Sequence, residues 1–171
     1  MASFRSGNFD FILHSVHIRW GSGADARIPP LKELAKWIEK RRKEKHVIDK
    51  DIIIMGDFNI PKLDDPVFQA ITSKGLTIPD VLRGLEHGSN LKGNARYDQI
   101  LHYRRHTKTF TDVGGVLDFF KDDWESLFPP ASYPGMDKTQ FTYQMSDHLP
   151  LWVQLDTWTD DEELDQIINR P

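Results

Sequence analysis

The sequence predicts a mixed fold of the α/β or α+β class, formed by a single domain over residues 1–171. Short segments in which apolar and polar residues alternate, or in which apolar residues are continuous, are typical of strands. Other segments repeat apolar residues every three to four positions, which is typical of helices. Hydrophobic residues make up 39% of the chain and aromatic residues 11%, so the composition supports a packed core in a chain of one-domain length.

The strands are predicted from the pattern of apolar residues. In residues 9–20, Phe11 and Leu13 would lie on one face of the strand, and Ile12 and Val16 on the other. Further strands are predicted at residues 51–55, whose continuous apolar run suits burial on both faces, and at residues 97–103, 107–113, 139–145 and 149–157.

Two helices are predicted in the first half of the chain. Pro29 and Pro30 would begin a helix over about residues 31–45, because proline is favoured in the first turn of a helix. Asp65 and Pro66 would begin the second, with the carboxylate as its cap. The basic end of the first helix suits a solvated last turn that complements the helix dipole.

The second half of the chain is less regular. Residues 84–94 are polar and rich in glycine, which predicts a loop, and residues 117–128 fit either a helix or a packed loop. A capping-box pattern predicts a carboxy-terminal helix at about residues 160–169, after a core that runs over residues 9–157.

Composition and charge exclude several classes of function. The absence of cysteine excludes disulfides, thiolate nucleophiles and cysteine-ligated zinc. A net charge of −4 disfavours a wholly basic nucleic-acid-binding surface, but a nuclease can hold phosphate through a local patch. No segment has the length of a membrane span, and residues 1–8 lack the apolar core of a signal peptide. We therefore expect a soluble protein without an export signal, which favours the cytoplasm.

Polar residues follow the predicted buried strand at Asp57 and Asn59. These two positions are two residues apart, so in extended backbone their side chains project to the same side, while Phe58 points into the core. Loops at strand ends commonly carry binding and catalytic groups. An Asx turn that closes the strand explains the same residues at least as well when they are considered alone.

Two more polar positions lie beside predicted strands. Asp98 lies on an apolar strand, and a buried carboxylate needs a partner; a histidine would suit, because the pair orients the ring and raises its pKa. Ser146, Asp147 and His148 directly precede the last predicted strand. A solvated strand end and a polar cap remain the alternative interpretations of these two motifs.

Taken together, the three motifs Gly-Asp-Phe-Asn, Tyr-Asp-Gln-Ile-Leu and Ser-Asp-His-Leu-Pro resemble those of the endonuclease/exonuclease/phosphatase superfamily. Its members include pancreatic-type deoxyribonucleases, abasic-site endonucleases, neutral sphingomyelinases and inositol polyphosphate 5-phosphatases. His17 also fits the family strand that carries a histidine before the first motif. The resemblance covers about residues 9–155.

The resemblance implies hydrolysis of a phosphoester by water, assisted by Mg²⁺ or Mn²⁺. It implies that Asp57 orients or deprotonates the water and that Asn59 hydrogen-bonds the phosphate or the attacking oxygen. It further implies that His148, held by Asp98, donates to the phosphoryl oxygen. His17 would be a second phosphate-facing histidine, and Asp147 would bind or orient the metal together with Asp57.

Basic residues near the second motif suggest a contact with a polyanion. Arg96 lies just before it, and Arg104 and Arg105 follow the strand, so all three are candidate phosphate or substrate contacts. An exposed strand end explains this cluster at least as well.

One departure from the family is large. The family domain is a sandwich of two sheets with helices outside, and its first half supplies an Asn and the Glu that is the principal metal ligand. Residues 1–16 contain no Glu, and the first Glu of the chain is Glu33. The chain therefore resembles the carboxy-terminal portion, a truncated domain with an incomplete metal site. The expected fold is one mostly antiparallel mixed sheet flanked by helices, the second half of the deoxyribonuclease-like four-layer sandwich.

These observations leave the function open between two classes. The first is a divalent-metal-dependent phosphoester hydrolase. A nuclease-type phosphodiesterase is favoured, and a phosphatase or phospholipase of the same family is the alternative. The second is a catalytically inactive remnant that serves as a binding or assembly module. A single sheet of a sandwich would expose its inner face, so we expect association, most simply a symmetric homodimer.

Overall fold

The larger sheet of the computed structural model has four strands, and the model describes residues 1–47, 49–122, 124–157 and 168. The strand order is β1 (Ala2–Ser6), β2 (Phe9–His17), β3 (Ile52–Asp57) and β4 (Asp98–His102). Only the central β2–β3 pair is parallel; both outer pairs are antiparallel. The mixed, mostly antiparallel character expected from the sequence is confirmed. Strand β1, which forms a hairpin with β2, was not predicted.

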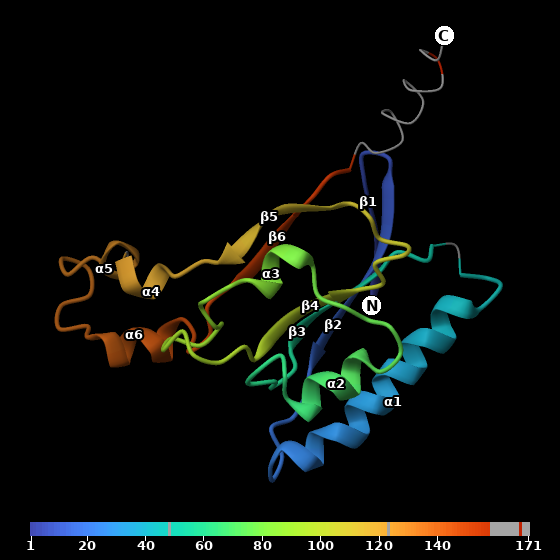
Figure 1. Ribbon diagram of the computed structural model, residues 1–171. Coiled ribbons are helices and arrows are strands. Elements are labelled where there is room, and N and C mark those ends of the chain that lie inside the picture. The colour runs from blue at the N-terminus through green and yellow to red at the C-terminus, as the bar shows by residue number, and fades with distance from the viewer. Residues whose placement is uncertain (48, 123, 158–167, 169–171) are drawn as a thin grey trace.

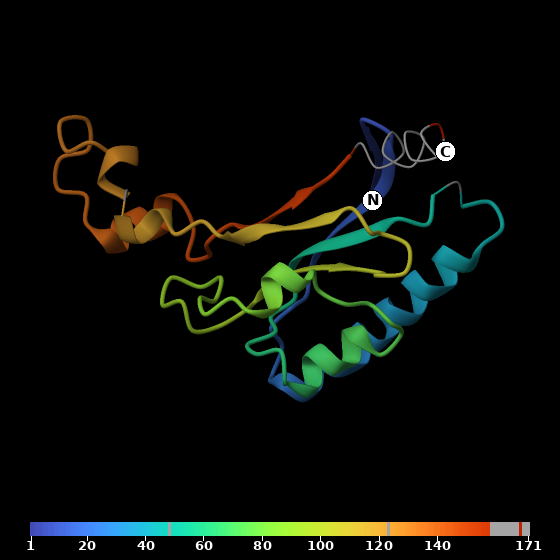
Figure 2. The ribbon, with the colours of Figure 1, turned by 45° about the horizontal axis from the view of Figure 1, so that its top comes forward.

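The remaining two strands form a separate antiparallel ribbon of β5 (Phe110–Val116) and β6 (Leu151–Leu155). The strands are thus divided between two sheets and do not form the one sheet that was expected. Figures 1 and 2 show the ribbon on the side of the larger sheet opposite the long helix. Its inward residues pack on Ile53 and Ile100 of the larger sheet. The ribbon is therefore the beginning of a second layer.

Two helices cover the other face of the sheet (Figure 1). The second, α2 (Pro66–Thr72), begins as predicted, with the Asp65 carboxylate accepting a hydrogen bond from the Val67 amide at 2.8 Å. Both helices bury their apolar residues against Ile54 and Leu101. The main core therefore lies between the sheet and this helical layer.

The first helix, α1 (Ala24–Lys43), begins seven residues before the predicted start at residue 31. Pro29 and Pro30 lie inside it and do not begin it. The earlier turn is held by Arg27, which donates to the carbonyl of Trp20 at 2.8 Å and lies 4.2 Å from the centre of the Trp20 ring. Tertiary contacts of this kind stabilise a turn that the local sequence does not favour.

The predicted strand at residues 139–145 is wrong, because this segment forms helix α6 (Lys138–Gln144). Asp137 and Gln140 form a capping box at its start, and this local pattern prevails over the alternation of apolar residues. Phe141 is fully buried and is surrounded by four rings with centroids 5.4–5.9 Å away, those of Phe119, Phe120, Trp124 and Phe128.

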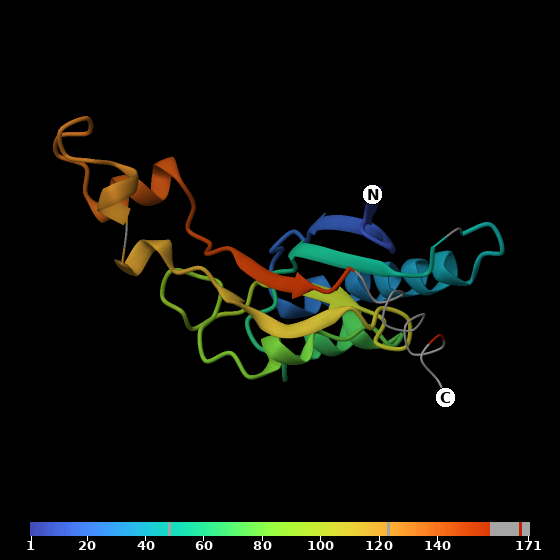
Figure 3. The same ribbon diagram turned by 90° about the horizontal axis from the view of Figure 1, so that it is seen from above.

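Three short helices complete the described fold: α3 (Asp80–Arg83), α4 (Phe119–Asp122) and α5 (Trp124–Leu127). Helices α4, α5 and α6 form a lobe at one end of the molecule (Figure 3). Of the two structures considered for residues 117–128, a helix and a packed loop, the helical one is therefore observed, as two short helices. The predicted carboxy-terminal helix falls, apart from Ile168, outside the described residues. Within the described part, no helix is long and apolar enough to cross a membrane.

Candidate active site

An aspartate and a histidine 50 residues apart in the chain form the closest polar pair of the site. Asp98 begins β4, and His148 lies in the segment that leads into β6. The Nδ1 atom of His148 lies 2.7 Å from Oδ2 of Asp98, and because a carboxylate oxygen accepts, Nδ1 donates. The side chains are 21% and 28% exposed, so the pair is shielded but can still be reached from solvent.

The loop before β4 positions both members of this pair. The Asp98 amide donates to the hydroxyl of Ser89 at 3.0 Å, and the Leu149 amide donates to the carbonyl of Ser89 at 2.6 Å. Ser89 is 2% exposed and joins the start of β4 to the chain that carries His148. Sequence reasoning missed Ser89, since a serine in a polar loop carries no signal of such a tertiary role.

The environment of His148 favours its protonated form. Burial alone would lower the pKa of His148, but the hydrogen bond to Asp98 and the charges of Asp98, Asp57 and Asp147 raise it above its usual value. Tyr97 packs beside the ring, with centroids 5.8 Å apart. A histidine held in this way can present a proton on Nε2 while Nδ1 remains bound to the carboxylate.

A row of side chains crosses three strands at the same edge of the sheet. His17 ends β2 opposite Asp57 of β3, and Asp57 in turn lies opposite Asp98 of β4. Directly opposite residues project to the same face, so the three side chains share one surface. The Nε2 atom of His17 is 3.5 Å from Oδ2 of Asp57. The sheet register thus brings together four of the predicted residues once His148 is included.

Asn59 holds Asp57 in place. Its backbone amide donates to Oδ1 of Asp57 at 2.7 Å, which is the Asx turn considered from the sequence. Its side-chain amide donates to the Ile18 carbonyl at 2.6 Å and to Oδ2 of Asp57 at 3.4 Å. The residue is 8% exposed with φ at 52°. In this arrangement the donors of Asn59 face the protein and not a substrate.

The carboxylates do not complete a metal site by themselves. Asp147 is exposed beside His148, and Asp57 engages Asn59 and His17. Within the described residues, no three aspartate, glutamate, histidine or cysteine side chains are grouped so that they could hold a metal ion. Asp57 and Asp147 therefore fit as oxygen donors, and Mg²⁺ or Mn²⁺ bound there would need water and substrate phosphate as its other ligands.

The three candidate arginines lie in two different places: Arg96 borders a small cavity together with Asp98, and the other two lie farther along the chain. Arg96 donates to the backbone carbonyls of Leu82, at 2.8 Å, and Leu85, so it holds the loop. Arg104 and Arg105 lie beyond the far end of β4, and the strand from Asp98 to its last residue spans about 13 Å. Arg104 and Arg105 are thus separated from the Asp98–His148 pair along β4, and a contact of the three arginines with a polyanion stays a prediction.

A mostly apolar cavity opens beside the pair. Asp98 and His148 lie on its wall, and its volume is about 380 Å³. Apolar side chains from β3, the lobe and the segment before β6 line it, among them Met55, Phe119 and Met145. Met55 is 39% exposed, because the β5–β6 ribbon does not cover this part of the sheet face.

The titration of His148 provides a direct check of this geometry. We expect its pKa in the folded protein to lie above the ordinary value of 6.5. The pair should then stabilise the fold fully below pH 6.5, and this contribution should be lost as the pH rises through the folded pKa. An NMR titration of the histidine Cε1 protons measures this, with His102, whose pKa is lowered to about 4, as an internal contrast. A midpoint for His148 below 6.5 would contradict the pair.

Comparison with known proteins gives a match in structure. No family model matches the chain, and no curated protein matches it in sequence. A mannosyl-6-phosphatase of Bacteroides thetaiotaomicron superposes with a TM-score of 0.51 at 18% identity, over 86% of this chain and 52% of that one. An endonuclease/exonuclease/phosphatase family protein of the same organism gives 0.50 at 18% identity, over 85% and 48%.

An AP endonuclease of Archaeoglobus fulgidus gives a TM-score of 0.52 at 18% identity, over 86% of this chain and 61% of that one. The chain thus spans about half to three-fifths of the length of these solved structures. At this identity the likeness concerns the fold. The chain has the fold of about half of an endonuclease/exonuclease/phosphatase-type domain.

Proposed function

We propose that this chain carries the phosphate-facing half of a divalent-metal-dependent phosphoester hydrolase site, with a phosphodiester of nucleic acid as its first candidate substrate. The observation that carries the proposal is the 2.7 Å hydrogen bond between Asp98 and His148, which lies beside the His17–Asp57 row. Solved structures with the same fold include a phosphatase and an AP endonuclease, which supports phosphoester chemistry.

Each residue has a role that its contacts support. His148, with its pKa raised by its contact with Asp98, would donate from Nε2 to a phosphoryl oxygen and stabilise the negative charge that develops there. Asp57, kept in place by Asn59, would accept a proton from the attacking water or orient it. His17 is 77% exposed next to Asp57 and would be a second contact for the phosphate.

The metal is the incomplete part of the proposal. Bound Mg²⁺ or Mn²⁺ would neutralise phosphate charge, with Asp57 and Asp147 as oxygen ligands. The described residues do not supply a third ligand, so no step of the mechanism is assigned to the metal. With two candidate carboxylates, water and a phosphate oxygen of the substrate would supply the remaining ligands of the metal.

Nicking of supercoiled plasmid tests the hydrolase. We expect nicking by the wild-type chain with Mg²⁺ or Mn²⁺, its loss in EDTA, and a decrease of about 100-fold or more in His148→Ala. The exposed His46 provides a matched control, His46→Ala, which should nick like wild type. Parallel assays with a phosphomonoester and a synthetic phosphodiester separate phosphatase from nuclease. Equal background in wild type and His148→Ala would favour the binding or assembly module.

The uncovered sheet face supports self-association as a second part of the proposal. On this face Phe4 is 47% exposed and Met55 is 39% exposed, although both lie on the larger sheet. A second copy could bury this surface through a symmetric contact. Light scattering at micromolar concentration should give the mass of a dimer, and Met55→Asp should shift it toward the monomer. A monodisperse wild-type monomer would contradict this part.

A further inference from the structure

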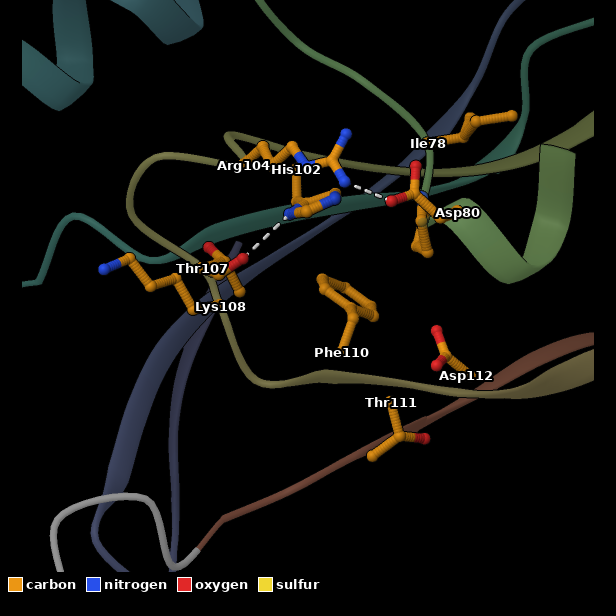
Figure 4. Close-up of a pocket in the computed structure, with 10 residues that line it drawn as sticks. Ile78, Asp80, His102, Arg104, Thr107, Lys108, Phe110, Thr111 and Asp112 are labelled. Atoms are coloured by element: carbon orange, nitrogen blue, oxygen red, sulfur yellow. Dashed lines mark hydrogen bonds and ion pairs between the residues drawn. The ribbon is translucent and has the colours of Figure 1, made fainter. Parts of the chain in front are cut away.

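A second cavity, of about 240 Å³, lies at the end of β4 that is remote from Asp98. The end of β4, the loop after it, the start of β5 and the turn before α3 form its walls (Figure 4). Pockets for drug-sized ligands measure about 300–1,000 Å³, so this cavity suits a smaller molecule. Its lining residues have no role in the proposed hydrolysis.

His102 gives this cavity a buried acceptor. The residue is 4% exposed, and its Nδ1 atom is 3.2 Å from the carbonyl oxygen of Thr107. A carbonyl only accepts, so Nδ1 carries the hydrogen and Nε2 carries a lone pair. Burial lowers the pKa of His102 to about 4, which keeps the ring neutral near pH 7. Among the described residues Nε2 has no hydrogen-bond partner, and in Figure 4 that edge of the ring faces the Asp80 side of the cavity.

Charges of both signs border the same cavity. Arg104 forms an ion pair with Asp80, which also lies 3.3 Å from the Nε atom of Arg83. A guanidinium has five N–H donors, so Arg104 keeps donors for a further anion. Asp112 is exposed, has no ion pair within the described part of the chain and turns its carboxylate toward Asp80, while Lys108 points outward (Figure 4).

The ring of Phe110 supplies an apolar wall of the cavity. Its centroid lies 4.4 Å from that of His102, and in Figure 4 the ring lies beside the imidazole. The cavity therefore offers the cation of Arg104, the unpaired carboxylate of Asp112, the neutral acceptor of His102 and one aromatic surface, with Lys108 at its border. A simple anion would leave the Asp112 carboxylate and the imidazole lone pair without donors, and a simple cation would leave the remaining donors of Arg104 without an acceptor.

We propose that this cavity binds a small zwitterion, an α-amino acid with an apolar side chain. Its carboxylate accepts hydrogen bonds from Arg104, and its ammonium group donates to Asp112 and to Nε2 of His102. Its side chain packs on Phe110. This ligand pairs Arg104, Asp112 and His102 at once, and its size suits the cavity.

Three matched ligands test the proposal by calorimetry on the full chain at pH 7. L-leucine carries both charges, 4-methylpentanoate lacks the ammonium group, and 3-methylbutylamine lacks the carboxylate. We expect leucine to bind about tenfold or more tightly than either fragment, because each fragment leaves a charged group of the cavity unpaired. No binding of leucine at millimolar concentration, or equal binding of either fragment, would overturn the proposal.

A matched pair of variants locates the site. Asp112 and Asp64 are both exposed aspartates without an ion pair among the described residues, and Asp64 lies outside the cavity. Asp112→Asn should weaken leucine binding about tenfold, and Asp64→Asn should leave it unchanged. In the wild-type protein, nitrogen NMR should show the Nε2 resonance of His102 shifting on addition of leucine. Binding by Asp112→Asn at wild-type affinity, or an unmoved Nε2 resonance, would overturn the assignment. None of these readouts depends on hydrolysis.

Discussion

Replacing Gly56 with alanine should destabilise the fold by about 3 kcal/mol or more, or prevent folding altogether. Gly56 lies directly before Asp57, at φ +135°. A Cβ atom there would lie 2.0 Å from the carbonyl oxygen of Val16 on the neighbouring strand. That oxygen belongs to the backbone of β2, so relief of the clash requires separation of the two central strands. An effect of this size is a large fraction of the stability of a typical domain, about 5–15 kcal/mol.

Gly135 provides the control for this experiment. It also has a positive φ, +79°, but a Cβ atom there would have no neighbour within 4 Å. Gly135→Ala should therefore show the conformational strain alone, about 1–2 kcal/mol. Urea unfolding followed by circular dichroism compares the two variants. If Gly56→Ala is no less stable than Gly135→Ala, the close approach of β2 and β3 at the site edge is not as described.

Replacing Asp98 with asparagine should reduce phosphoester hydrolysis by about 10²–10⁴-fold, a prediction that rests on the proposed function. Asparagine retains the size of the side chain but removes the charge that favours the imidazolium form of His148. Burial would then dominate, and the pKa of His148 should fall. Because the proposed donor is the protonated ring, the alkaline limb of the pH–rate profile should move to lower pH.

Two measurements keep this prediction separate from a loss of folding. Asp64→Asn makes the same chemical change at an exposed position outside the site and should retain activity. An NMR titration of Asp98→Asn should show a lower midpoint for His148 than in wild type, whether or not the chain hydrolyses the substrate supplied. A variant that loses activity with an unchanged His148 midpoint would show that Asp98 does not act through this histidine.

The order of the three motifs was sufficient to predict the fold to which this chain is similar. Asp57, Asp98 and His148 each follow or precede an apolar strand, and strand ends are local features that a sequence records. The alternation of Ile12 and Leu13 between two faces was also readable, and the structure buries them in different clusters. Periodicity failed at residues 139–145, where Phe141 faces an aromatic lobe and the capping box of Asp137 starts a helix.

The positions of the three arginines in space could not be predicted from their positions in the sequence. Arg96, Arg104 and Arg105 are close to Asp98 in sequence, but a strand carries its two ends about 13 Å apart and a loop turns Arg96 toward backbone carbonyls. Their closeness in the sequence therefore does not bring all three to one place in the structure. His102 and Asp112 are separated by ten positions, yet they border one cavity, since the chain reverses between β4 and β5.

The sequence by itself determined which residues stand at the strand ends and that their order resembles a phosphoesterase fold, because both are properties of contiguous segments. Only the tertiary structure decided that β2, β3 and β4 align His17, Asp57 and Asp98 in one row. It alone decided that Ser89 brings His148 to Asp98 and that Asn59 turns its donors inward. These contacts join segments up to 60 residues apart, and their geometry depends on sheet register and loop packing, which no local pattern encodes.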